Sequence, residues 1–241
     1  MDRDASLNPK FDKLSIALND NPDQEPDPNR ETCSGGMLAG YVTYDPTKYQ
    51  DQGLVSICPH TLQTFYSLHD IMYPPEWALD ENGNPEEGFG CDGLLGRDTD
   101  YMLSPGGMLL HEFMHWPYLF QDIPDYSTLI RKYPKRGFSM ISDYKGRTAS
   151  DPEDGYGPFY AMALPKKISS STGRSKAIQN ADNYVWYALT KFWTFRCSRR
   201  FGPAISQEDA NLRGFFDDAF SGDSEDDASE DVAGNKAAGV H

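Results

Sequence analysis

The sequence predicts an α+β fold with short strands first and amphipathic helices after them. Runs rich in β-branched and aromatic residues, bounded by Gly, Asp and Pro, stand in the first quarter of the chain and are typical of strands. In three later segments, apolar residues recur at the three- and four-residue steps of a helix. The length of 241 residues allows one large domain, and 38% hydrophobic residues make a sizeable core feasible.

Composition divides the chain into three parts. Residues 1–32 are polar and rich in Asp, Asn and Pro, so they bury too little apolar surface to offset the entropy lost on ordering. We therefore expect a flexible N-terminal segment over residues 1–32 and one folded domain over residues 33–216. Residues 217–241 carry eight acidic residues and one lysine, which predicts a disordered acidic tail.

Two strands and a helix are predicted before residue 73. Strands are expected at residues 40–44 and 53–58, and Pro59 ends the second of them. Between residues 61 and 72 the apolar side chains follow helical spacing, so one amphipathic helix is expected there.

A long loop and an apolar helix come next. Residues 73–99 contain Pro-Pro, Asn-Gly-Asn-Pro and several glycines, so we expect a long loop that Cys91 cross-links to another segment. Residues 106–116 are largely apolar and Pro117 follows them. A helix is therefore expected to end near residue 116.

The second half is expected to be loop and then helix. Residues 121–157 are rich in turn-forming residues and predict a loop. Helical spacing returns at residues 159–164 and again at residues 176–195. We expect the large aromatic side chains of the last helix to pack in the core; they are Tyr184, Trp186, Tyr187, Phe192 and Trp193.

Charge and hydropathy exclude two classes of partner. The formal net charge is −15, from 22 basic and 37 acidic residues, and it opposes a phosphate backbone, so we expect no nucleic acid partner. The longest apolar runs, such as residues 106–110, are far shorter than the roughly 20 residues that cross a bilayer. No membrane partner is expected, and we expect a monomer.

The four cysteines, Cys33, Cys58, Cys91 and Cys197, form no C-x-x-C pair, which disfavours a zinc knuckle or a thioredoxin-type site. Their even number favours two disulfides, as in exported proteins, with three pairings open. We expect an extracellular protein. The first residues show no basic segment followed by an apolar one, so a signal peptide is expected to be absent from this sequence.

The sequence His111-Glu-Phe-Met-His115 lies in the apolar helix of residues 106–116. Histidines four residues apart lie one turn apart, so both imidazoles leave the same face and can bind one zinc ion. Glu112 would lie beside the open metal position, where it can take a proton from an activated water. With five His and 11 Glu in the chain, chance alone would give roughly 0.005 such motifs.

A catalytic zinc takes three protein ligands, so a third must come from elsewhere. No histidine follows His115 before His241, which lies in the acidic tail, so a carboxylate is expected. The candidate carboxylates are Asp122, Asp125, Asp143, Asp151, Glu153 and Asp154.

Three blocks of the sequence resemble the fungal aspzincins. They are His111–His115, an aspartate followed by Tyr156-Gly-Pro, and Asn180-Ala-Asp-Asn-Tyr-Val-Trp-Tyr-Ala188, within a likeness that spans residues 33–196. Aspzincins are deuterolysin-like and lysine-specific metalloendopeptidases, with secreted relatives of uncharacterised activity. The resemblance implies a zincin-like fold with an H-E-x-x-H active-site helix, zinc (Zn²⁺), a peptide or protein substrate, and an aspartate ligand within G-T-x-D-x-x-Y-G.

The chain departs from that last pattern. The position three residues before Tyr156 is Glu153, and no Gly-Thr precedes it. Asp143 fits if residues 145–155 are an insertion between the ligand and Tyr-Gly, and Asp154 fits if one residue is missing. We favour Asp143 as the ligand, with Asp154 and Glu153 as the alternatives.

Two further residues are candidates for the chemistry. Tyr156 can donate a hydrogen bond to a developing oxyanion, and Asp182 can orient a ligand histidine through its second nitrogen. The sequence thus predicts a zinc metalloendopeptidase with Glu112 as general base. The alternative is a secreted zinc-binding or host-interaction protein of the same fold with little or no peptidase activity.

Overall fold

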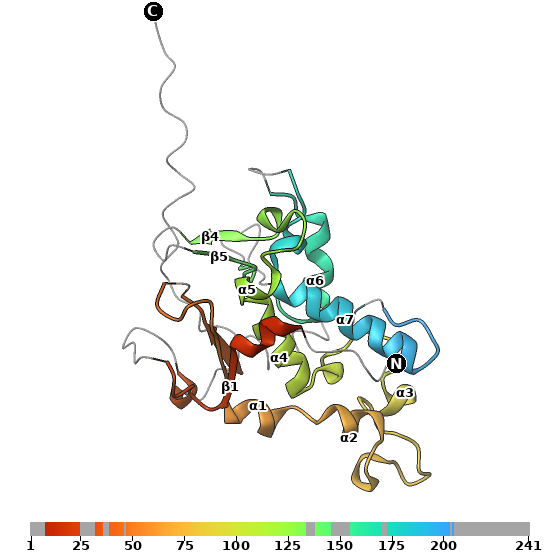
Figure 1. The fold of residues 1–241 in the computed structure, drawn as a ribbon. Helices are drawn as coiled ribbons and strands as arrows, with labels where there is room; N and C mark the ends of the chain where they lie inside the picture. The colour runs from red at the N-terminus through yellow and green to blue at the C-terminus, as the bar shows by residue number, and fades with distance from the viewer. Residues whose placement is uncertain are drawn as a thin grey trace, which may run out of the picture.

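The structure is a computed structural model, and its architecture is mixed α and β, as predicted (Figure 1). It describes residues 8–24, 32–35, 39–45, 47–133, 138–145, 155–169, 173–202 and 204. A small sheet comes from the N-terminal part of the chain, and helices supply most of the remainder. Among the described residues, no helix is long and apolar enough to cross a membrane.

The main sheet has three strands in the order β1-β3-β2. Strand β3 (Gly53–Ile57) is buried along its whole length and lies at the centre. Strand β2 (Gly40–Thr43) pairs antiparallel with it, and β1 (Leu14–Leu18) pairs parallel with it. The predictions of strands at residues 40–44 and 53–58 are confirmed.

The first strand corrects the prediction of a flexible segment over residues 1–32. Residues 8–24 are described: a 3₁₀ turn, η1 (Pro9–Lys13), leads into β1, which pairs with β3 from Leu14↔Gly53 to Leu18↔Ile57. The ring of Phe11 also lies 5.7 Å from that of Phe113. A polar average over 32 residues hides this short apolar stretch, whose backbone groups find partners only once β3 is folded. Residues 1–7 and 25–31 lie outside the described residues.

The single helix predicted over residues 61–72 is wrong, because two short helices stand there. Helix α1 (Pro59–Thr64) ends at Phe65, which has extended backbone angles, and α2 (Leu68–Met72) begins after Ser67. The Ser67 side chain accepts a hydrogen bond from the backbone N–H of Asp70, which favours a new helix start at that point. Apolar spacing alone does not reveal this break.

Two disulfides join distant segments. Cys33 pairs with Cys58, and Cys91 pairs with Cys197. The prediction of two disulfides is confirmed, and the pairing left open by the sequence is decided. The Cys91–Cys197 bond ties the long loop of residues 73–99 to the end of α7 (Ala181–Arg196), as expected for that loop. This loop also contains η3 (Glu76–Ala78) and α3 (Gly90–Gly93).

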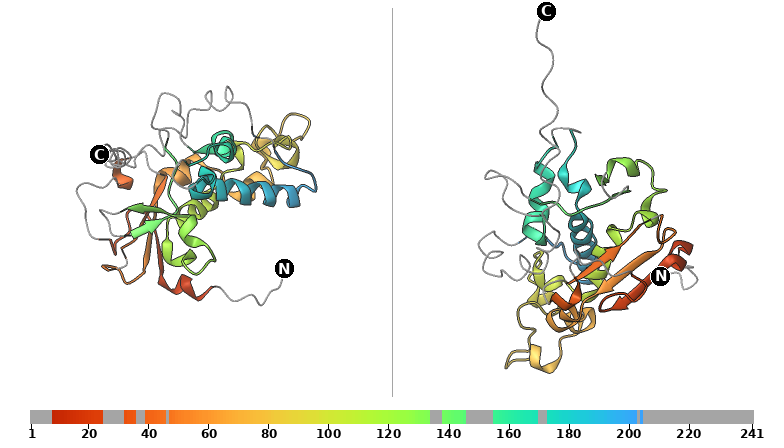
Figure 2. Two further views of the ribbon diagram at one scale, coloured as in Figure 1. Left: turned by 90° about the horizontal axis from the view of Figure 1, so that it is seen from above. Right: turned by 90° about the vertical axis from the view of Figure 1, so that its left-hand side faces the viewer.

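Helix α4 (Pro105–Met114) lies between the sheet and α7 (Figures 1 and 2). After α4 come α5 (Pro117–Phe120) and, later in the chain, α6 (Gly157–Ala163), which packs on α7. From residue 100 onward, the described part of the chain also contains the 3₁₀ turns η4 (Asp100–Met102), η5 (Tyr126–Thr128), η7 (Leu164–Lys166) and η8 (Lys176–Gln179). The main core cluster forms between these helices and includes Met102, Met108, Val185, Trp186 and Trp193.

Two predictions for the second half need correction. Residues 121–157 are not all loop, because β4 (Arg131–Tyr133) and β5 (Phe138–Met140) form an antiparallel pair of three-residue strands. Strands this short carry too little alternation to be recognised. Tyr187 is 66% exposed and lies outside the core, whereas Trp186 and Trp193 are buried as expected.

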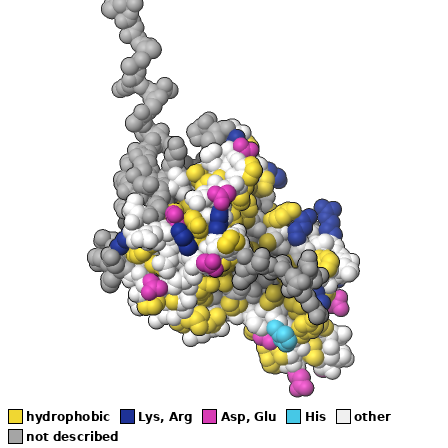
Figure 3. All heavy atoms as spheres, viewed as in Figure 1, with side chains coloured by type: hydrophobic (Ala, Val, Ile, Leu, Met, Phe, Trp, Pro, Cys, Tyr) yellow, Lys and Arg dark blue, Asp and Glu magenta, His cyan; other side chains and the backbone are white. Residues whose placement is uncertain are grey.

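The face shown in Figure 3 carries scattered acidic and basic side chains among hydrophobic ones. The described residues on this face form no continuous basic surface.

The two disulfides should differ in their contribution to stability. They close loops with sequence separations of 25 and 106 residues. Loop-closure entropy then predicts that losing Cys91–Cys197 costs about 1.3 kcal/mol more than losing Cys33–Cys58. Urea unfolding of the Cys33→Ser/Cys58→Ser and Cys91→Ser/Cys197→Ser double variants measures both costs. A larger loss for the Cys33–Cys58 pair would contradict the entropic account.

Candidate metal centre

Helix α4 presents both histidines of the H-E-x-x-H sequence to one side. Ser104 caps the helix by accepting a hydrogen bond from the backbone N–H of Gly107, and Pro105 occupies its first turn. His111 and His115 are 2% and 6% exposed, and their ring centroids are 4.9 Å apart. The local sequence thus forms a short helix that places two imidazoles together in the interior.

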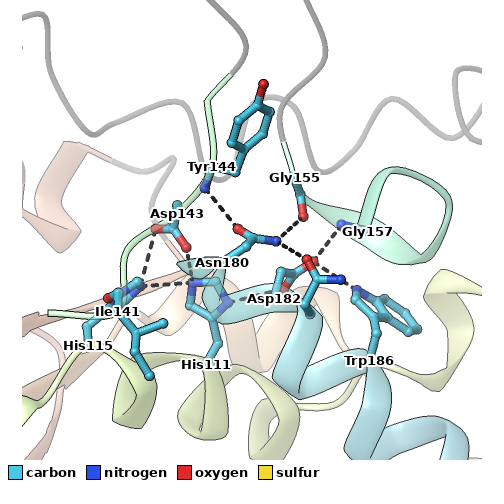
Figure 4. Close-up of polar contacts among 11 residues, drawn as sticks. His111, His115, Ile141, Asp143, Tyr144, Gly155, Gly157, Asn180, Asp182 and Trp186 are labelled. Carbon is cyan, nitrogen blue, oxygen red and sulfur yellow. Dashed lines mark hydrogen bonds and ion pairs between the residues drawn. The ribbon is translucent and has the colours of Figure 1, made fainter. Parts of the chain in front are cut away.

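Asp143 completes a cluster of three donors, which we call the metal triad: His111, His115 and Asp143 (Figure 4). The carboxylate oxygens of Asp143 lie 3.2 Å from Nε2 of His111 and 3.2 Å from Nε2 of His115. The two Nε2 atoms are 3.1 Å apart. This His-His-Asp group could bind a metal ion.

The spacing of these atoms matches a tetrahedral ion. Metal–ligand bonds of 2.0–2.1 Å at tetrahedral angles place neighbouring donor atoms about 3.3 Å apart. The three separations in the metal triad are 3.1, 3.2 and 3.2 Å. The two nitrogens, and each nitrogen with the Asp143 oxygen that it faces, are therefore spaced much as neighbouring ligands of one ion are; His111 faces Oδ1 and His115 faces Oδ2.

The second nitrogen of each imidazole is already engaged. Nδ1 of His115 donates to the carbonyl oxygen of Ile141 at 2.8 Å, and a carbonyl can only accept. Nδ1 of His111 lies 3.2 Å from Oδ1 of Asp182, which accepts from it. Both Nε2 atoms consequently face the Asp143 carboxylate, whose buried Oδ1 has, besides its ion-pair contact with His111, no hydrogen-bond partner among the described residues. This arrangement fits a cation between the three side chains.

The pKa values of the metal triad also indicate that Asp143 requires a positive charge beside it. Burial by itself raises the pKa of Asp143, but the two imidazoles outweigh burial and hold it well below its usual value. Burial likewise lowers the pKa of each imidazole, but Asp143 outweighs it, raising the pKa of His111 well above its usual value and that of His115 to about 9. Without metal, protons supply the charge that balances Asp143.

Helix α7 holds the segment that carries Asp143. Ser142 pairs with Asn180 in an isolated parallel bridge, in which the Ala181 N–H donates to the Ser142 carbonyl at 2.9 Å. The segment after β5 is thereby fixed above α4, although Asp143 lies 28 residues beyond His115 in the sequence. Asp143 and the histidines meet only because α4 and α7 pack together.

Asp182 occupies the place predicted for a residue that orients a histidine. Besides the contact with His111, its Oδ2 accepts from the backbone N–H of Gly157 at 2.7 Å and from the indole N–H of Trp186 at 2.8 Å. Trp186 was expected to be core only, and this additional contact was missed. A tryptophan four residues after an acid on one helix face was the available signal.

The remaining carboxylate candidates lie apart from the metal triad. Asp122 is exposed and pairs with Lys10 at 2.8 Å, and Asp125 stands in an exposed turn with a positive φ of 62°. Among the described residues, Asp143 is the carboxylate that joins the two histidines. Asp151, Glu153 and Asp154 lie outside the described residues.

Glu112 and Tyr156 are both buried near the metal triad. Glu112 is 4% exposed, and an added Cβ on Gly40 of β2 would come 3.4 Å from its Oε1, so β2 passes close to this carboxylate. The ring centroid of Tyr156 lies 6.1 Å from that of His111. Tyr156 also directly precedes Gly157, which Asp182 holds.

No family model, no curated protein and no solved structure matches this chain. The likeness to aspzincins remains a prediction from the three sequence blocks.

Metal binding should release protons. Against the opposing effect of burial, the pKa values of His111 and His115 are raised, chiefly by Asp143, so this pair binds protons in the metal-free protein that a metal ion must displace. Affinity should therefore fall as pH falls from 9 towards 6. Titration calorimetry with Zn²⁺ at pH 7.5, in buffers of different ionisation enthalpy, measures the protons released.

The Asp143→Asn variant is the control for this prediction. It removes the charge that raises both histidine pKa values, so it should bind metal more weakly and release fewer protons. If the heat of Zn²⁺ binding to the unmodified protein did not change with the ionisation enthalpy of the buffer, no protons would be released, and the prediction would be wrong.

Proposed function

We propose that this protein is a zinc-dependent metalloendopeptidase. The observation that carries the proposal is the convergence of Nε2 of His111, Nε2 of His115 and the Asp143 carboxylate at 3.1–3.2 Å. Glu112, a buried carboxylate, lies in the same helical turn. An acid beside two histidine ligands is the arrangement that metal-assisted peptide hydrolysis requires.

The choice of zinc rests on the donor set. Two imidazoles and one carboxylate suit Zn²⁺ as well as Fe²⁺, and the H-E-x-x-H spacing with Glu112 between the histidines favours Zn²⁺. Three protein ligands leave a fourth position open, as in catalytic rather than structural sites. When bound there, the metal would lower the pKa of a water molecule and polarise the scissile carbonyl. The Ile141 carbonyl and Asp182 keep both imidazoles turned towards that position.

Two side chains would assist the reaction: one would transfer the proton, and the other would stabilise the oxyanion. Glu112 accepts a proton from the attacking water and passes it to the leaving amine, as a general base and then a general acid. Tyr156 donates a hydrogen bond from its phenolic O–H to the oxyanion that forms at the scissile carbonyl. The Gly157 N–H bond to Asp182 couples the position of Tyr156 to that of His111.

The proposed setting is extracellular, with peptides or proteins as substrates. Two disulfides are compatible with an oxidising compartment, and no described helix is suited to cross a membrane. We keep the expectation of a monomer without nucleic acid or membrane partners.

A second function has one observation in its favour. The sequence around Glu153 departs from the aspzincin pattern that it resembles. A secreted zinc-binding or host-interaction protein would keep the metal triad and lose efficient hydrolysis.

The Glu112→Gln variant tests the mechanism. Gln keeps the shape of Glu but cannot accept a proton, so hydrolysis of unfolded casein should fall by about 10²–10⁴-fold. Zinc stoichiometry should stay at one per chain, because Glu112 is not a ligand. Casein cleavage with and without a chelator, beside metal analysis of the same samples, measures both quantities.

The Asp143→Ala variant serves as the contrast, since it should lose zinc and activity together. Undiminished cleavage by Glu112→Gln would refute Glu112 as the base. Bound zinc without chelator-sensitive cleavage in the unmodified protein would favour the second function.

A further inference from the structure

The side chain of Asn180 connects the two segments that carry Asp143 and Tyr156. Asn180 is fully buried and immediately precedes α7. Its Oδ1 accepts from the backbone N–H of Tyr144, the residue after Asp143, at 2.8 Å. Its Nδ2 donates to the carbonyl of Gly155, the residue before Tyr156, at 2.9 Å (Figure 4). One amide therefore contacts both sides of the site.

The two segments are also joined to each other. The Gly155 N–H donates to the Tyr144 carbonyl at 2.8 Å, so both residues lie against the Asn180 amide. Gly155 has no room for a side chain there, because an added Cβ would come 2.8 Å from Nδ2 and 2.9 Å from Oδ1 of Asn180. The fit between this glycine and the amide is close.

Asp143 depends on its neighbours for orientation. Among the described residues, the polar contacts of its carboxylate are the two imidazoles of the metal triad. Its backbone is held on one side through Ser142, which pairs with residues 179–181, and on the other through Tyr144, which Asn180 holds. Fixing both adjoining peptide groups fixes the direction of the Asp143 side chain. A ligand must be held to within about 0.5 Å of its productive position.

We propose that Asn180 is a positioning residue for the site. Its Oδ1 fixes the position of Asp143, the third metal ligand, and its Nδ2 fixes the position of the turn that carries Tyr156. The part about Tyr156 rests on the proposed function, whereas the part about Asp143 concerns metal binding alone. Neither half of the amide touches the reacting atoms.

The test compares Asn180→Ala with a matched variant on the same helix. Asn183 accepts from Asn180 Nδ2 at 2.8 Å and donates to the Ala161 carbonyl at 2.6 Å, and within the described part of the chain it makes no hydrogen bond to Tyr144 or Gly155. Asn183→Ala thus removes two hydrogen bonds near the start of α7 and leaves both positioning contacts. Gly155→Ala is the second probe, because its methyl group would come within 3 Å of the Asn180 amide and of Leu164 Cδ1 and so must displace them.

Zinc affinity by chelator competition is the main measurement, with the melting temperature of the metal-free protein beside it. Asn180→Ala should bind zinc about 10–100-fold more weakly, as expected when the partner of a ligand is lost. Gly155→Ala should weaken binding in the same direction, and Asn183→Ala should stay within about threefold of the unmodified protein. In the peptidase assay, Asn180→Ala should lower kcat more than it raises KM.

Two results would overturn the inference. One is zinc affinity within about threefold in Asn180→Ala, and the other is an equal loss in Asn183→Ala, which would indicate a general effect on α7. If circular dichroism shows that Asn180→Ala is unfolded, the Gly155→Ala affinity decides in the same way. Absence of hydrolysis in the unmodified protein would refute the proposed function and leave the zinc comparison standing.

Discussion

The arrangement of the site depends on one electrostatic constraint: a buried carboxylate and two buried imidazoles face one another across about 3 Å. Asp143 cannot be ionised there without a neighbouring positive charge, because the imidazoles are the polar contacts of its carboxylate among the described residues. Protons on the histidines supply that charge in the metal-free protein. A metal ion could replace them, because the two imidazoles and the carboxylate lie close enough together to hold one.

The surrounding elements act by fixing these three side chains. Helix α4 brings two imidazoles together, and residues around the start of α7 hold the rest of the site through backbone and side-chain contacts. Asp182 orients His111, and Asn180 holds the peptide group next to Asp143. Asn180 and Asp182 at this helix start are buried, and each is hydrogen-bonded to the turn that carries Tyr156. A buried hydrogen-bond network of this kind holds each side chain in a single orientation, because moving one member would leave its partners without a hydrogen bond.

The fold was predictable where a local pattern is long enough to be periodic. The strands β2 and β3 and the helices α4 and α7 stand close to their predicted positions. Three features were missed for physical reasons. β1 is stabilised by pairing with a strand 39 residues later, β4 and β5 are only three residues long, and the break at Phe65 depends on a serine cap. Average composition and apolar spacing carry none of this information.

The sequence by itself determined the pair His111 and His115 with Glu112 beside them, because the pitch of a helix converts a four-residue spacing into a shared face. Only the tertiary structure decided that Asp143 faces them, since the sequence favoured Asp143 but left Asp154 and Glu153 open as alternatives. The same holds for the disulfide pairing, for the contacts of Asn180 with Tyr144 and Gly155, and for the contact of Asp182 with Gly157. Those contacts join residues far apart in the chain, and their distances are set by how α4, α6 and α7 pack together.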